Sequence, residues 1–314
     1  MIFDTIKENF MEKSSSLDKV VGKVSEEEKK KIFDTFKTRF ETTDIPKLKE
    51  LEREKTPEER QMLREINEAT NAIRRKFGLE DFDIPEENIH VIPKENWATE
   101  GETAVSLPEL QTILLRERER GIHFAESAFH EAIHFKSYNA VQKLTDCDKV
   151  VSYRHGLRIW PRSQEKRNSL PSGDPLSYFA DLNEAVTEEL TRQYIMIQKE
   201  NPLYKKDFDE TKEIKEEALK KGEYKLLLDQ EIFSLFKDPG DETIRYAKFA
   251  YPAERFSLFQ IRNDLFQKNR DLFKSSEEVL DVFARAMFTG NMMELAHLME
   301  KTFGKGTMRA VGTP

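Results

Sequence analysis

Apolar residues recur every three to four positions over most of the chain, which is the spacing of an amphipathic helix. The clearest case lies between Pro57, which suits the first turn of a helix, and Gly78, which suits its end. Residues 1–80 as a whole are therefore expected to be mainly helical. The same spacing predicts three helices in the C-terminal part, over Thr243–Lys268, Ser276–Phe288 and Met292–Phe303.

Short β-rich runs interrupt this helical pattern in the first half of the chain. Three of them predict strands, at Ile89–Pro93, Ala104–Ser106 and Gln111–Leu115. The run Val150–Trp160 predicts a hairpin that turns near His155 and Gly156. The chain is therefore expected to be an α+β protein that is mostly helical.

Shifts in composition divide the chain into four expected parts. Residues 1–80 would form an N-terminal helical region, and residues 81–200, which hold the predicted strands, would form the core. Residues 201–240 are rich in Lys and Glu and weakly amphipathic, which indicates a charged helical insertion or lid. Residues 241–314 would form a C-terminal helical subdomain.

Composition narrows the classes of function. Of the 314 residues 35% are charged, and the net charge is −8, so nucleic-acid binding is not expected as the main role. No apolar run approaches the roughly 18 residues of a membrane span, and the N-terminus lacks the pattern of a signal peptide. Cys147 is the only cysteine, so no disulfide can form within the chain. We expect a cytoplasmic protein.

An H-E-x-x-H motif is formed by His130, Glu131 and His134, within a run free of Pro and Gly. Residues four positions apart lie on one face of a helix, so both imidazoles would face one metal ion. Glu131 would lie close enough to polarise a water at that metal. The alternative is an amphipathic helix that carries two polar residues by chance. His130 lies among apolar neighbours, however, and a buried imidazole needs a partner, which favours the metal site.

A catalytic zinc site usually has three protein ligands, so a third is expected downstream. Glu184 and Glu188 lie four positions apart in the Glu-rich run Asp181–Thr191, on one face of a predicted helix. Glu184 can be the third ligand. Glu188 can accept the remaining N–H of a ligand histidine and so fix its tautomer. The alternative is an ordinary acidic surface, and the upstream motif favours the metal site.

The H-E-x-x-H motif followed by an N-E-A-x-x-E helix resembles the gluzincin group of zinc metallopeptidases, the thermolysin-like arrangement. The resemblance covers residues 88–200, and it departs from the metzincins, whose third histidine is missing here. It implies a zincin-like domain with a small β-sheet ahead of the active-site helix, whose edge strand pairs with the substrate backbone. It also implies one Zn²⁺ held by His130, His134 and Glu184, with Glu188 supporting a ligand histidine. The 50 residues between His134 and Glu184 would accommodate an inserted hairpin.

The same resemblance implies peptide-bond hydrolysis with Glu131 as general base. A second electrophile, usually a tyrosine or histidine, would stabilise the oxyanion. Tyr251 is the first candidate, because a tyrosine some distance after the Glu-bearing helix resembles the aminopeptidase branch of the gluzincins. His155, on the predicted hairpin, is the second. Tyr178 and Tyr153 are the remaining candidates.

Three classes of function stay open at this point. The first is a zinc peptidase of restricted specificity acting on a peptide or protein. The second is a non-catalytic zincin-fold protein that uses the metal for structure or partner binding, although a structural zinc would not need Glu131. The third is a metal-dependent hydrolase of a non-peptide substrate. Manganese or cobalt would suit the same ligands less commonly than zinc, and the oligomeric state is not set by these patterns.

Overall fold

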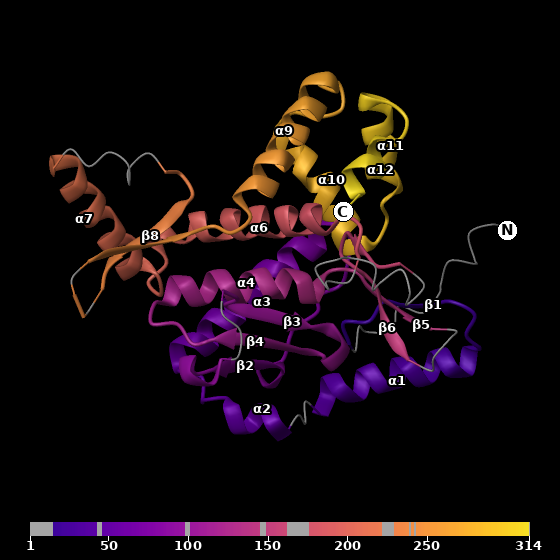
Figure 1. Ribbon diagram of the computed structural model, residues 1–314, viewed down its shortest axis with the longest axis horizontal. Helices are drawn as coiled ribbons and strands as arrows, with labels where there is room; N and C mark the ends of the chain where they lie inside the picture. Colours follow the sequence, from indigo (N-terminus) through magenta and orange to yellow (C-terminus); the bar gives the residue numbers. More distant parts are fainter. Residues whose placement is uncertain are drawn as a thin grey trace.

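The computed structural model is an α+β structure that is mostly helical, which confirms the class predicted from the hydrophobic pattern. Figure 1 shows two helices, α4 (Gly121–Lys136) and α6 (Ala180–Ile197), lying side by side at the centre of the molecule. The residues that the structure describes are 15–42, 46–97, 101–144, 149–161, 176–221, 229–238, 240–241 and 243–313.

Three helices precede the core in the chain: α1 (Glu26–Thr42), α2 (Pro46–Leu51) and α3 (Pro57–Lys76). A capping box fixes the start of α3, because the Thr56 hydroxyl accepts the Glu59 N–H while Glu59 accepts the Thr56 N–H. The helix predicted from Pro57 is confirmed. The prediction of a mainly helical N-terminal region missed the strand β1 (Lys19–Val21), and residues 1–14 lie outside the described part.

The three predicted strands are confirmed as β2 (Ile89–Ile92), β3 (Ala104–Leu107) and β4 (Thr112–Arg116). They form one sheet in the order β2-β4-β3, with β2 parallel and β3 antiparallel to β4. The outer side of β2 is covered in part by Arg53, whose N–H donates to the Val91 carbonyl. Strand β3 is the edge that lies against α4. Short 3-10 turns flank these strands, at Glu86–Asn88, Lys94–Asn96 and Pro108–Leu110.

A second sheet follows α4, in the order β1-β5-β6-β7. It contains β5 (Asn139–Lys143) and the predicted hairpin, which is confirmed as β6 (Val150–His155) and β7 (Arg158–Ile159). Gly156 takes a φ of +59° at the first central position of the two-residue turn, where glycine is favoured. Strands β1 and β5 were not predicted, because strands of three and five residues are too short to show a clear alternation of apolar and polar residues. Cys147 lies outside the described residues.

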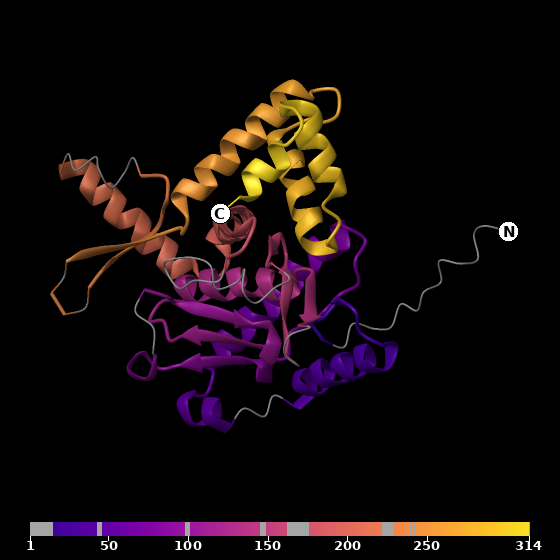
Figure 2. The same ribbon diagram turned by 45° about the vertical axis from the view of Figure 1, so that its right-hand side comes forward.

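The C-terminal half differs from the prediction at one element. Residues 201–240 were expected to be helical. They follow the 3-10 turn Gln198–Glu200 and contain α7 (Lys205–Lys221), but also the strand β8 (Ile232–Lys237). The expected helix Thr243–Lys268 begins instead with β9 (Ile244–Lys248), which pairs antiparallel with β8. Pairing outweighs the weak helical pattern of this charged segment. Figures 1 and 2 show α7 and this ribbon projecting from one end of α6.

Four helices complete the chain: α9 (Pro252–Lys268), α10 (Ser276–Thr289), α11 (Met293–Phe303) and α12 (Thr307–Gly312). The expected helix Thr243–Lys268 also included Tyr251, whereas the helix begins only at Pro252. Proline suits the first turn of a helix and disfavours the right-handed α conformation in the residue before it. Tyr251 has a φ of 51°, in the left-handed region. The predicted helices at Ser276 and Met292 are confirmed to within one or two residues.

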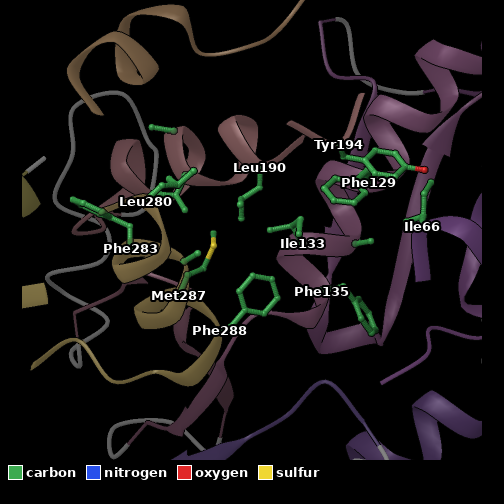
Figure 3. Packing of buried hydrophobic residues seen from close by; sticks show 14 of the residues in the cluster. Ile66, Phe129, Ile133, Phe135, Leu190, Tyr194, Leu280, Phe283, Met287 and Phe288 are labelled. Carbon is green, nitrogen blue, oxygen red and sulfur yellow. The ribbon is translucent and has the colours of Figure 1, made fainter. Parts of the chain in front are cut away.

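One large hydrophobic cluster joins α3, α4, α6 and α10 (Figure 3). The rings of Phe129 and Tyr194 stack with centroids 4.1 Å apart, and Ile133 and Leu190 pack beside Met287 of α10. This packing fixes the spacing between α4 and α6. Within the described residues, no helix combines the length and apolar character that crossing a membrane requires. The division into four parts stays a prediction, since this cluster includes residues of all four.

Candidate metal centre

The two histidines of the motif lie one turn apart on α4 and are nearly buried. Their Nε2 atoms face each other at 3.1 Å. The opposite side of the helix, with Phe129 and Ile133, is anchored in the core. The start of α4 is held from outside the helix, because Asp207 of α7 accepts the Ile122 N–H at 3.0 Å. The helix therefore presents both imidazoles from a fixed support.

Glu184 on α6 completes the group. Its Oε2 lies 3.1 Å from Nε2 of His134 and 3.4 Å from Nε2 of His130. Ligand atoms arranged tetrahedrally at the roughly 2.0–2.1 Å bond length of zinc lie about 3.3 Å apart. The three spacings agree with that value. Among the described residues these three side chains form a group that could hold a metal ion.

The electrostatics of the group favour a positive charge between its ligand atoms. Burial alone would raise the pKa of Glu184, but the charge of His134 and hydrogen bonds from both histidines hold that pKa well below its usual range. Burial alone would lower the pKa of His130, but hydrogen bonds to Glu184 and Glu188 raise it well above its ordinary value. A cation among these atoms satisfies the ionised carboxylate and the imidazole lone pairs together.

Glu188 is fully buried behind the group and has two partners. One carboxylate oxygen accepts the Nδ1–H of His130 at 2.8 Å, and the other accepts the backbone N–H of Ala250 at 2.7 Å. The first bond leaves Nε2 of His130 free to be a ligand. The second bond fixes the chain directly before Tyr251.

Glu131 is also nearly buried, on the side of the group next to β3. Burial raises the pKa of its carboxyl group, while the charges of His130 and His134 oppose that rise. The backbone N–H of Ser106, in the middle of β3, hydrogen-bonds the Glu131 carboxylate. Glu131 therefore stands between the metal group and the edge strand.

The two leading candidates for oxyanion stabilisation both lie beside the group. The Tyr251 ring stacks on the His130 ring, with centroids 6.0 Å apart and planes at 20°. Burial, followed by the charges of Glu184 and Glu131, raises the pKa of its hydroxyl, so Tyr251 stays a hydrogen-bond donor. His155 donates from Nε2 to the His134 carbonyl at 2.7 Å, and burial lowers its pKa to about 4.

The other two tyrosines are placed differently. Tyr178 is 39% exposed and pairs through its backbone with Ile159. Tyr153 occupies the point on β6 where the register with β5 shifts. Among the described contacts of the metal group, Tyr251 and His155 appear and these two do not.

Two contributors to the site were not predicted. Asn183 lies with its amide nitrogen 3.4 Å from Nδ1 of His134, and its amide oxygen accepts the Leu157 N–H at 2.8 Å. Its position directly before Glu184 was the available signal. The backbone N–H of Ala250 acts through the main chain, which leaves no mark on the sequence.

No protein-family model, curated protein or solved structure matches this chain. The interpretation of the site therefore depends on its geometry and on the sequence motif.

Proposed function

We propose that the chain is a zinc-dependent peptidase of restricted specificity. The observation that carries the proposal is the convergence of His130, His134 and Glu184 at zinc-like spacing with Glu131 beside them. Two imidazoles and a carboxylate are the donor set of thermolysin-type catalytic sites. A zinc ion bound there would supply a Lewis acid and a water of lowered pKa.

Glu131 is the general base in this proposal. Burial raises the pKa of its carboxyl group towards neutral pH. A pKa in that direction suits a group that accepts a proton from water and returns it to a leaving amine. A metal site with a purely structural role would have no use for a buried carboxylate at this position. This is the reason for preferring catalysis to a binding or structural role.

Tyr251 is the proposed oxyanion donor. Its hydroxyl is kept protonated by burial and by the charges of nearby carboxylates, and Glu188 holds the chain directly before it through the Ala250 N–H. His155 is the weaker candidate, because its Nε2–H is already donated to the His134 carbonyl and its Nδ1 carries no proton when the ring is neutral. His155 then serves to hold the end of α4.

A peptide is the proposed substrate because β3 borders the site. This strand is the edge of its sheet, and Ser106 in its middle contacts Glu131. An extended peptide added along β3 would pass the metal group with its backbone hydrogen-bonded to the strand. The zincin-like arrangement implied by the sequence resemblance has the same order of edge strand, active-site helix and Glu-bearing helix.

Metal content and peptide cleavage test the proposal together. Wild-type protein is expected to bind about one zinc per chain, and His134→Ala and Glu184→Ala are expected to lose it. His297→Ala, which removes an exposed histidine of α11, is the matched control and should keep zinc. Glu131→Gln should keep zinc and lose cleavage of an unstructured peptide library. Wild-type protein that binds no zinc, or zinc-loaded protein that cleaves no peptide, would contradict the proposal.

A further inference from the structure

The tip of the β6–β7 hairpin places an arginine next to the metal group. His155 and Arg158 are direct partners across the two strands. Directly opposed residues of an antiparallel pair project their side chains from the same face of the sheet. The His155 ring lies 5.7 Å from that of the ligand His134. Arg158 therefore projects from the face of the hairpin that looks towards the metal ligands.

The guanidinium of Arg158 is held by contacts other than a carboxylate in the part of the chain that the structure describes. Its Nε donates to the hydroxyl of the buried Ser177 at 3.0 Å, and its carbon lies 4.9 Å from the centre of the Trp160 ring. Among the described residues Arg158 takes part in no ion pair, although it is only half-exposed. Its two terminal nitrogens keep the geometry that binds a carboxylate through two parallel hydrogen bonds.

The charge of Arg158 stands close to the site, because Arg158 lies directly opposite His155, whose ring is 5.7 Å from that of the ligand His134. Glu184, the carboxylate of the metal group, is committed to both ligand histidines. Among the described residues, the terminal nitrogens of Arg158 are therefore available to an anionic group that arrives from outside the chain.

We propose that Arg158 binds a carboxylate of the substrate, so that the enzyme prefers peptides with an acidic group close to the cleaved bond. This inference rests on the proposed peptidase function. An extended peptide advances about 3.3 Å per residue, and Arg158 lies directly across the strand pair from His155, so the acidic group is expected within a few positions of the cleaved bond. The carboxylate comes from an Asp or Glu side chain or from the C-terminus of a short peptide. The common feature is a planar anion whose two oxygens accept hydrogen bonds from both terminal nitrogens of Arg158.

Matched peptides test this preference. A library of internally quenched peptides first locates the position at which acidic residues are enriched in wild-type cleavage. Pairs that differ only by Glu or Gln at that position, each with a free or an amidated C-terminus, then separate a side-chain carboxylate from a terminal one. Wild type is expected to favour the acidic member by about 10- to 100-fold in kcat/KM.

Three variants assign the preference to Arg158. Arg158→Gln should abolish the preference, so that the Glu and Gln peptides are cleaved with equal kcat/KM. Arg158→Lys should keep part of the preference, because a lysine retains the charge but not the paired geometry. Arg118→Gln is the matched control, since Arg118 is also half-exposed and takes part in no ion pair within the described part of the chain, but precedes the start of α4 at Gly121. That variant should discriminate as wild type does. Zinc content and thermal unfolding of each variant report whether the fold is kept.

The outcomes separate the two proposals. Wild-type protein that cleaves peptides without discriminating Glu from Gln, or an Arg158→Gln variant that still discriminates, overturns the role of Arg158 and leaves the peptidase intact. If Arg158→Gln and Arg118→Gln lose the preference for the acidic peptide equally, the role of Arg158 is overturned as well. Such a result would mean that the preference comes from the combined charge of several residues and not from one residue. Zinc-loaded Glu131→Gln should bind the Glu peptide more tightly than the Gln peptide. Calorimetry measures both affinities without turnover. Absence of any cleavage overturns both proposals.

Discussion

At the scale of single residues, Glu188 links two parts of the site that are far apart in the sequence. Its carboxylate holds the ring of His130 through one oxygen and the chain before Tyr251 through the other. A carboxylate that accepts two N–H groups in a buried setting is fixed in one orientation. The placement of a metal ligand and that of the proposed oxyanion donor are therefore tied to one side chain.

Replacing Glu188 should disturb both partners. In Glu188→Ala, Nδ1 of His130 and the N–H of Ala250 lose their buried acceptor, so zinc affinity is expected to fall by about 10- to 100-fold. Competition with a chromophoric chelator measures that affinity. Glu189→Ala, at the next position of α6 and in contact with arginines instead, is the control and should bind zinc as wild type does. Unchanged affinity in Glu188→Ala would contradict the role of this bond.

Tyr251→Phe removes only the hydroxyl of the proposed oxyanion donor. The stacked ring and the backbone conformation before Pro252 stay the same, so zinc content is expected to be unchanged. Loss of one oxyanion donor should lower kcat by about 10²- to 10³-fold with little change in KM. Steady-state cleavage of one peptide measures both constants, and Tyr178→Phe should match wild type. A kcat close to that of wild type would assign the donor elsewhere.

The sequence was sufficient for the residues whose placement follows from helical spacing. His130 and His134, like Glu184 and Glu188, lie one turn apart, and the structure brings the first three together and sets Glu188 behind them. Arg158 and the Ala250 N–H were not predicted, because each reaches the site only through pairing or packing with a distant segment. The residues that share one face of a helix follow from their spacing in the sequence. The residues that share one face of a hairpin depend on the register of its two strands.

At the scale of elements, α7 and β8 are attached to the start of α4. Arg120, directly before α4, forms ion pairs with Asp207 and Glu210 of α7, and its guanidinium stacks on Phe236 of β8. His123 of α4 packs edge-on against Phe233 and Phe236. The charged insertion is therefore coupled to the helix that carries the metal ligands. Its ribbon was missed because Lys- and Glu-rich runs favour helix when read alone.

His123 makes this attachment sensitive to acid. Burial, followed by the charges of Arg118 and Arg120, lowers the pKa of its ring to about 3 in the folded chain, against 6.5 for the free group. Between these values the unfolded chain binds a proton that the folded chain does not, so stability falls as pH drops through this window. His123→Phe keeps an aromatic ring in the contact but cannot bind a proton, so it should remove the part of the acid-induced loss of stability that His123 causes.

Urea unfolding at about pH 7 and about pH 4.5 measures the effect. Each pH unit in the window corresponds to about 1.4 kcal/mol at most, and partial exposure of the ring reduces it. Wild type should therefore lose about 1–2 kcal/mol more than His123→Phe between the two conditions. His297→Gln, which changes an exposed histidine, should lose as much as wild type. Equal losses in His123→Phe and wild type would contradict a depressed pKa.

At the scale of the whole molecule, the site draws on segments from most of the chain. Helix α4 supplies two ligands and α6 the third, the β6–β7 hairpin holds the end of α4, and the joint between β9 and α9 supplies Tyr251. Residues of α4, α6 and α10 share one hydrophobic core. A metal that binds only the folded arrangement stabilises the assembly as a whole.

Removing the metal should therefore lower the melting temperature of the whole protein and not only its activity. Free zinc at about 1,000 times its Kd contributes about 4 kcal/mol, which corresponds to a rise of about 5–10 °C for a chain of this size. Melting with zinc and with an excess of chelator measures the difference. His297→Ala should respond as wild type, and Glu184→Ala should respond little, because its remaining ligands bind zinc weakly. If the chelator leaves the melting temperature of the wild type unchanged, the ligand group keeps its arrangement without a metal, and zinc contributes no free energy to the fold.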